Sequence, residues 1–161
     1  MKTSLEPPIP LLDLGAVHGA LAEELLGDFE RVLRSGQFIL GPEHDAFERE
    51  LALASGVRHA IGVASGTAAL SIALLALGLE PGDEVIVPAF TYFASASAVT
   101  SLGARPVFVD VEPDRLGPDP ARVEAALTPR TRAIMAVHLY GLSCDLGPLL
   151  ELGRRRSIAV L

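Results

Sequence analysis

The 161-residue sequence predicts an α/β fold in which a mostly parallel sheet carries helices on both faces. From His59 onward, short apolar runs of strand length alternate with stretches of helical periodicity, as expected for repeated βαβ units. The runs are apolar at consecutive positions, for example at 85–87, which is typical of parallel strands buried on both faces. Because half of the residues are hydrophobic and 20% are charged, the chain can build a core.

Residues 1–58 lack this alternation and are expected to form a separate N-terminal region with its own helices. An apolar stripe at helical spacing predicts a helix from about Ala16 to Ser35, and Gly36 ends it. Pro42 is expected to begin a second helix, because proline fits the first turn of a helix. The loop 36–42 between these helices holds apolar residues between two glycines, and it is either a plug in the core or a contact surface.

Residues 59–161 are expected to form an incomplete α/β unit, because the chain ends inside a buried-strand pattern at Leu161 and further sequence is expected to follow. Turn signals at 79–83, Gly103 and 112–114 separate the elements. The predicted strands lie near 60–64, 84–88, 106–109 and 133–138, with another from 158, and the predicted helices lie near 68–77, 93–102, 120–127 and 146–155.

Composition and charge argue against several classes of protein. A net charge of −7 and a pI near 5.0 do not suit nucleic-acid binding, which needs a basic face. No apolar run approaches the ~20 residues that span a bilayer and no signal sequence opens the chain, so a cytoplasmic protein without membrane contact is expected. The histidines lack metal-ligand spacing, and no metal site is expected. Cys144, the only cysteine, is expected to be inert packing with no histidine placed to activate it.

The small residues Ser65, Gly66 and Thr67 stand where the expected strand at 60–64 turns into a helix. Such a turn directs free backbone N–H groups and the positive end of the helix dipole at one point, and glycine permits close approach. A phosphate ester would suit this place, and the Thr67 hydroxyl could add a donor. Alternatively, Ser65 or Thr67 serves only to cap the helix. The turn has neither the lysine of a Walker loop nor the glycine spacing of a dinucleotide fingerprint.

Aromatic residues and one histidine follow two of the predicted strands. Phe90, Tyr92 and Phe93 come after the strand at 84–88, and His138 ends the strand at 133–138. Open α/β sheets bind ligands outside the carboxyl ends of their strands, so these residues and the Ser65 turn are expected on one edge. Any aromatic residue there either stacks on a planar ring or packs in the core. His138 is either an acid, base or polar support, or a structural residue.

Six segments together resemble, in order and spacing, the DegT/DnrJ/StrS family of sugar aminotransferases that use pyridoxal 5′-phosphate (PLP). They are 9–14, 36–42, 65–67, 88–92, 108–111 and 138–141. The resemblance implies the large domain of a type I PLP aminotransferase, truncated here, and a homodimer. It implies transfer of an amino group from glutamate or glutamine to a nucleotide-linked keto sugar. Ser65, Gly66 and Thr67 would hold the cofactor phosphate, and Tyr92 would lie against its pyridine ring.

By the same resemblance, the substrate side would involve Phe38, Leu40, Gly41 and His138. One departure is Leu142, where the family often has Gln. The Schiff-base lysine and the aspartate that pairs with the pyridine nitrogen would lie beyond Leu161, and Lys2 is the only lysine. The chain therefore holds none of the catalytic residues, and by itself it is expected to be inactive. The alternatives for the parent are a PLP-dependent sugar dehydratase of the same family, or a truncated non-catalytic protein that acts by binding or regulation.

Overall fold

A computed structural model describes residues 10–161, which fall into two compact units. We call residues 10–62 the N-terminal unit and residues 63–161 the sheet unit, and each is described by itself. Ile9, the first residue of one family-like segment, and Lys2 lie outside the described residues.

The N-terminal unit contains α1 (Leu14–Gly19), α2 (Ala22–Ser35) and α3 (Pro42–Ala54). The predicted single helix over 16–35 is wrong, because the chain breaks between α1 and α2. Gly19 is a weak helix former at this break, and the Leu21 N–H turns back to His18 O at 3.0 Å. The predicted end of α2 at Gly36, where φ is 68°, and the predicted start of α3 at Pro42 are confirmed.

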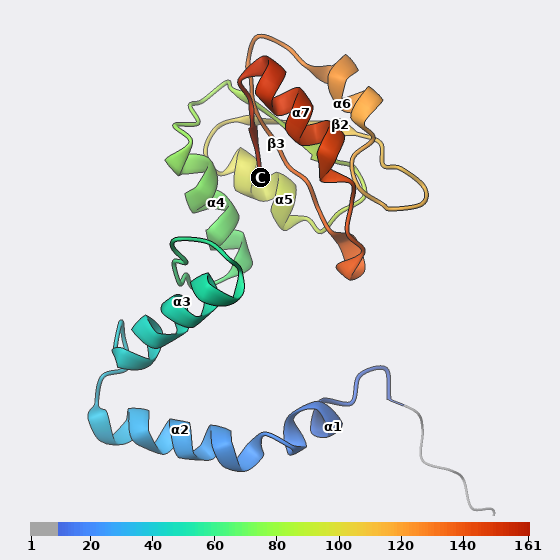
Figure 1. The fold of residues 1–161 in the computed structure, drawn as a ribbon. Coiled ribbons are helices and arrows are strands. Elements are labelled where there is room, and N and C mark those ends of the chain that lie inside the picture. The colour runs from blue at the N-terminus through green and yellow to red at the C-terminus, as the bar shows by residue number, and fades with distance from the viewer. Residues whose placement is uncertain (1–9) are drawn as a thin grey trace, which may run out of the picture. The chain divides into compact units, whose positions relative to one another are not determined.

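The sheet unit alternates helices and strands as predicted. All its strand pairs are parallel, in the order β2-β1-β3-β4, which confirms the expected fold class (Figure 1). Its elements are α4 (Gly66–Ala76), β1 (Glu84–Pro88), α5 (Ala94–Thr100), β2 (Arg105–Val109), α6 (Pro120–Ala126), β3 (Thr131–Ile134), a 3₁₀ turn η1 (Leu139–Gly141), α7 (Leu146–Arg156) and β4 (Ala159–Val160).

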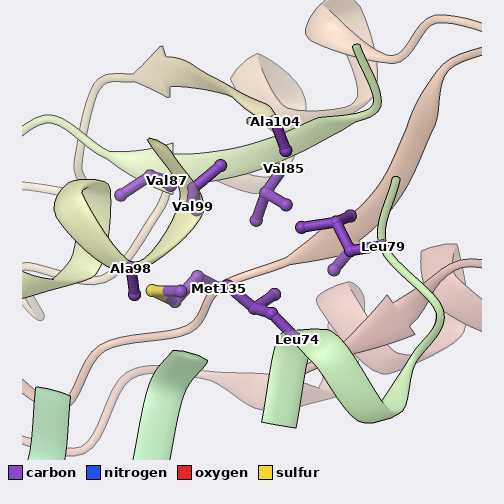
Figure 2. Close-up of a cluster of buried hydrophobic side chains, with 9 residues drawn as sticks. Leu74, Leu79, Val85, Val87, Ala98, Val99, Ala104 and Met135 are labelled. Carbon is purple, nitrogen blue, oxygen red and sulfur yellow. The ribbon is translucent and has the colours of Figure 1, made fainter. Parts of the chain in front are cut away.

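Successive side chains of a strand point to opposite faces of the sheet, so the central strands contribute to two separate cores. On one face, Val85 and Val87 of β1 pack with residues of α4 and α5, and Figure 2 shows this cluster. On the other face, Ile86 and Ile134 pack with residues of α6 and α7. The helix residues of the first core are Leu74, Ala98 and Val99, and those of the second are Val123, Leu149 and Leu152. Helices therefore cover both faces of the sheet.

The predicted strand near 60–64 is wrong. Residues 60–63 have no regular secondary structure, and Ile61 is 78% exposed. A strand exists only through hydrogen bonds to a neighbouring strand, and none of the four described strands pairs with this segment. Local sequence shows an apolar run but cannot supply the partner that makes a strand.

Candidate functional site

The path of the chain creates a topological switch point at the carboxyl ends of β1 and β3, the place where open α/β sheets have their ligand crevice. These strands are neighbours, yet β1 connects to β2 through α5 on one face, whereas β3 connects to β4 through α7 on the other. Two adjacent strands whose connections leave to opposite faces form a topological switch point, where open α/β sheets bind their ligands. The segments 89–93 and 135–145, which follow the two strands, flank this place.

The N-terminus of α4 points to the same edge of the sheet. The turn 77–83 leads from the end of α4 to the beginning of β1, so helix and strand run in opposite directions. An 11-residue helix and a 5-residue strand have similar lengths, roughly 16 Å each, which brings the start of α4 level with the carboxyl end of β1. In Figure 1, the beginning of α4 and η1 lie toward the same end of the sheet unit.

The first turn of α4 has two backbone donors that no protein group uses. Ser65 is extended, and its hydroxyl oxygen accepts from the Ala68 N–H at 3.1 Å, so it caps the helix. Within residues 10–161, the N–H groups of Gly66 and Thr67 donate to no protein acceptor. A Cβ added at Gly66 would meet no atom within 4 Å, so the space beside this turn is open. Capping by Ser65 and anion binding by the two following amides are therefore compatible.

The segment after β1 presents its aromatic rings rather than burying them. Tyr92 and Phe93 are each 76% exposed within the described chain, and Phe90 is half-exposed. Phe90 packs edge to face on Tyr140 of η1, with ring centroids 6.4 Å apart and planes at 70°. Tyr140 has a φ of 56°, a left-handed conformation that strains a non-glycine residue. This aromatic contact spans the switch point, and no motif in the sequence indicated it.

His138 follows β3 and contacts Cys144, which is buried beneath it. Its Nδ1 accepts a hydrogen bond from the Cys144 backbone N–H at 3.2 Å and lies 3.4 Å from the Cys144 Sγ. The prediction that no histidine is placed to activate Cys144 did not anticipate this contact. Burial nevertheless raises the pKa of the Cys144 thiol, which keeps the sulfur protonated and poorly nucleophilic.

The other residues expected on the substrate side belong to the N-terminal unit. Phe38 and Leu40 are 64% and 74% exposed in the loop between α2 and α3, which lines a hollow of about 470 Å³. Leu40 has a φ of 50°, and a Cβ on Gly41 would come within 2.7 Å of the Gln37 carbonyl oxygen. The loop is thus tightly folded with its apolar side chains turned outward.

Two features are absent from residues 10–161. No three His, Cys, Asp or Glu side chains gather closely enough to hold a metal ion. None of the helices in this part of the chain combines the length and the apolar character that a membrane crossing requires.

A family model described as the DegT/DnrJ/EryC1/StrS aminotransferase family matches residues 20–161. The UDP-N-acetyl-3-dehydro-alpha-D-glucosamine 3-aminotransferase of Acidithiobacillus ferrooxidans is 48% identical over 153 residues, which are 95% of this chain and 42% of the relative. DesV of Streptomyces venezuelae, solved in complex with a ketimine intermediate, matches with a TM-score of 0.94 and 48% identity, over 96% of this chain and 42% of that one.

NtdA of Bacillus subtilis, solved with the bound cofactor PMP, matches with a TM-score of 0.92 and 37% identity, over 99% of this chain and 37% of that one. The chain thus spans about two fifths of the length of the relatives it matches. These structures confirm the expected likeness to type I PLP aminotransferases. The chain belongs to the DegT/DnrJ/EryC1/StrS aminotransferase family.

Proposed function

We propose that the protein containing this chain is a PLP-dependent aminotransferase that transfers an amino group from glutamate or glutamine to a nucleotide-linked keto sugar. The observation that carries the proposal is the pair of backbone N–H groups at Gly66 and Thr67, which donate to no acceptor within residues 10–161 and stand at the start of α4. The names of the relatives support the substrate class, since they include aminotransferases of UDP- and dTDP-linked sugars.

The residues present fit the phosphate and the ring of the cofactor. The N–H groups of Gly66 and Thr67 would bind the phosphate dianion, which the positive end of the α4 dipole favours. Ser65 would keep the turn in shape through its bond to Ala68, and the exposed ring of Tyr92 would lie against the pyridine. PLP would supply the electron sink for cleavage at the amino-bearing carbon.

Phe38, Leu40 and Gly41 would contribute to sugar-nucleotide binding, and the working protein would be a homodimer. Their loop offers apolar surface around a hollow, which suits a base or sugar face better than a charged group. His138, which follows β3 in the sheet unit, would be a polar contact for the ligand bound at the switch point. Replacing Phe38 with Ala should then raise the KM for the nucleotide sugar more than the KM for the amino donor.

The 161 residues by themselves would bind the phosphorylated cofactor without joining it covalently. Residues 3–161 contain no lysine, and Lys2 is the only amine on a side chain. We therefore expect borohydride treatment of this chain with PLP to give no stoichiometric lysine adduct. A single adduct at a defined pocket, found by peptide mass spectrometry, would show that the Schiff-base position has been misassigned.

A glycine-to-alanine pair tests the phosphate site. Gly66→Ala adds a methyl group that touches no protein atom and favours helix, so the stability of the fold should be kept or slightly increased. The same methyl group would enter the space of the phosphate, so the affinity for pyridoxamine 5′-phosphate, which cannot form a Schiff base with lysine, should fall at least tenfold. Gly27→Ala in α2 also meets no atom within 4 Å and should leave affinity unchanged.

Activity is tested on the complete product of the reading frame that encodes this chain, called here the complete protein. Supplied with PLP, glutamate or glutamine and a nucleotide-linked keto sugar, it should form the amino sugar and the keto acid in equal amounts. Loss of water from the sugar without consumption of the amino donor would identify the dehydratase instead. Unchanged affinity for the cofactor in Gly66→Ala would remove the main support for the proposal.

A further inference from the structure

The hydrogen bond between Cys144 and His138 fixes where the imidazole carries its proton. A backbone N–H can only donate, so the Nδ1 atom that receives it at 3.2 Å must present a lone pair. A neutral ring then holds its proton on Nε2. A proton on Nδ1 would point at the Cys144 N–H and break this bond, so the contact disfavours the tautomer that carries its proton on Nδ1.

The Cys144 peptide is itself held by the loop that follows β2. Cys144 is only 4% exposed, and a Cβ added at Gly117 would come within 2.2 Å of its Cβ. Gly117 cannot retreat easily, because its carbonyl accepts from the Glu112 N–H at 2.9 Å and the next residue, Pro118, is fully buried in a bridge with Val111. Only a glycine leaves room for this contact, and the connection after β2 thereby supports the one after β3.

The opposite nitrogen of the ring remains free. His138 is exposed in the sheet unit, and its Nε2 has no protein partner within residues 10–161. The residue lies at the carboxyl end of β3, directly before the η1 turn whose Tyr140 contacts Phe90 across the switch point. A single N–H donor therefore stands at the rim of the crevice, on a ring that cannot easily rotate.

We infer that His138 donates a hydrogen bond, through Nε2–H, to an anionic oxygen of the ligand bound at the switch point, and that Cys144 and Gly117 are the positioning residues that hold its ring orientation. The inference rests on the proposed function, since it takes the phosphorylated pyridine cofactor as that ligand. It adds to that function a fixed direction of donation: Nδ1 accepts from the protein, and Nε2 donates to the ligand.

The tautomer is measured without any ligand. Nitrogen-15 NMR of the histidine-labelled chain, with His138→Gln to assign the signal, should show a pyridine-like Nδ1 and a protonated Nε2 for His138. Gly117→Ala should push the Cys144 peptide away and give a mixture of tautomers, whereas Gly27→Ala should leave the signals unchanged. A protonated Nδ1, or an equal mixture in the wild-type chain, would overturn the inference.

Two substitutions at His138 separate its two nitrogens in the complete protein. The amide nitrogen of Gln can take the place of Nε2, so His138→Gln should keep the affinity for pyridoxamine 5′-phosphate within about threefold. The amide of Asn reaches only the place of Nδ1, so His138→Asn should lose about tenfold or more, the usual effect of removing a hydrogen bond to a charged group.

Equal affinities of the Gln and Asn variants would overturn the inference while the proposed function stood. Failure of the wild-type complete protein to bind pyridoxamine 5′-phosphate would overturn the proposed function and the ligand assigned to His138 together. Because Gly117→Ala changes a buried contact, circular dichroism is used to check that this variant folds. If it does not fold, the affinities of His138→Gln and His138→Asn decide whether the inference holds.

Discussion

The hydroxyl group of Thr128 donates a 2.6 Å hydrogen bond to the carboxylate of Glu84, which is only 2% exposed at the start of β1. Arg105, the first residue of β2, donates to the other carboxylate oxygen. The bond from Thr128 and then the bond from Arg105 hold the pKa of Glu84 below its usual range. Two strands and the turn before β3 thus meet at one buried charge, at the edge of the sheet opposite the crevice.

We expect Thr128→Val to raise the pKa of Glu84 and to lower the free energy of unfolding at neutral pH by about 1–3 kcal/mol, because a donor to a buried carboxylate is lost. A carboxyl group whose pKa is lowered by folding stabilises the fold at pH values above its pKa in the unfolded chain. This contribution is lost as the pH falls through the folded-state pKa. The difference between variant and wild type should therefore shrink in acid. Urea unfolding at neutral and acid pH measures it, with Thr128→Ser as the control that keeps the hydroxyl. An equal difference at both pH values would refute the assignment.

Ser65 offers a way to separate helix capping from ligand binding. Ser65→Ala removes the acceptor of the Ala68 N–H and should cost about 1 kcal/mol of stability. Ser65→Asp keeps an acceptor and adds a negative charge that the helix dipole favours, so the free energy of unfolding should be retained. The same charge would repel a phosphate, so affinity for pyridoxamine 5′-phosphate should fall more in Ser65→Asp than in Ser65→Ala. The reverse order of affinities would contradict the phosphate site.

Neighbouring leucines of α4 should differ sharply in their effect on stability. Leu74 is fully buried against the sheet, whereas Leu75 is 60% exposed in the described chain. Leu74→Ala should lower the free energy of unfolding by about 2–5 kcal/mol through lost burial and the cavity left behind. Leu75→Ala should change it by less than about 0.5 kcal/mol, as surface substitutions do. A large loss for Leu75→Ala would mean that another surface covers this side of α4.

Gly153 lets α7 pack closely on the strand that follows it. A Cβ added there would come within 2.7 Å of the Ile158 carbonyl oxygen and 3.0 Å of a Val160 methyl group. Gly153→Ala should destabilise the fold by about 1–3 kcal/mol, because β4 must move away. Thermal unfolding against Gly27→Ala, where helix propensity changes without a clash, isolates the steric cost. Equal melting temperatures of Gly153→Ala and the wild type would show that β4 is not held in place.

The sequence predicted the elements whose signal is local. Consecutive apolar residues such as 85–87 identified the buried strands, and glycine and proline identified the C-terminal end of α2 and the start of α3. The strand near 60–64 failed because extended apolar chain becomes a strand only beside a partner. The helix over 16–35 failed because an apolar stripe does not reveal a break at Gly19.

Of the candidate site, the sequence predicted the helix start at Ser65 and Gly66 but not the contacts between side chains. Ser65 and Gly66 were recognisable from small residues before a helix, which is a short-range pattern. The contact of Phe90 with Tyr140 depends on which strands are neighbours and on a left-handed residue. The contact of His138 with Cys144 depends on how the five residues between them fold back. Neither has a periodicity or spacing that sequence alone can display.

The switch point between β1 and β3 owes its existence to the route of the backbone and not to any side chain that lines it. Exposed positions in the segments 89–93 and 135–145, such as Tyr92 and Tyr140, can therefore vary while the two cores keep their packing. Met135 and Cys144 lie in the same stretch of chain but are buried, so they belong to the framework. Variable and invariable positions should thus alternate within one loop, residue by residue.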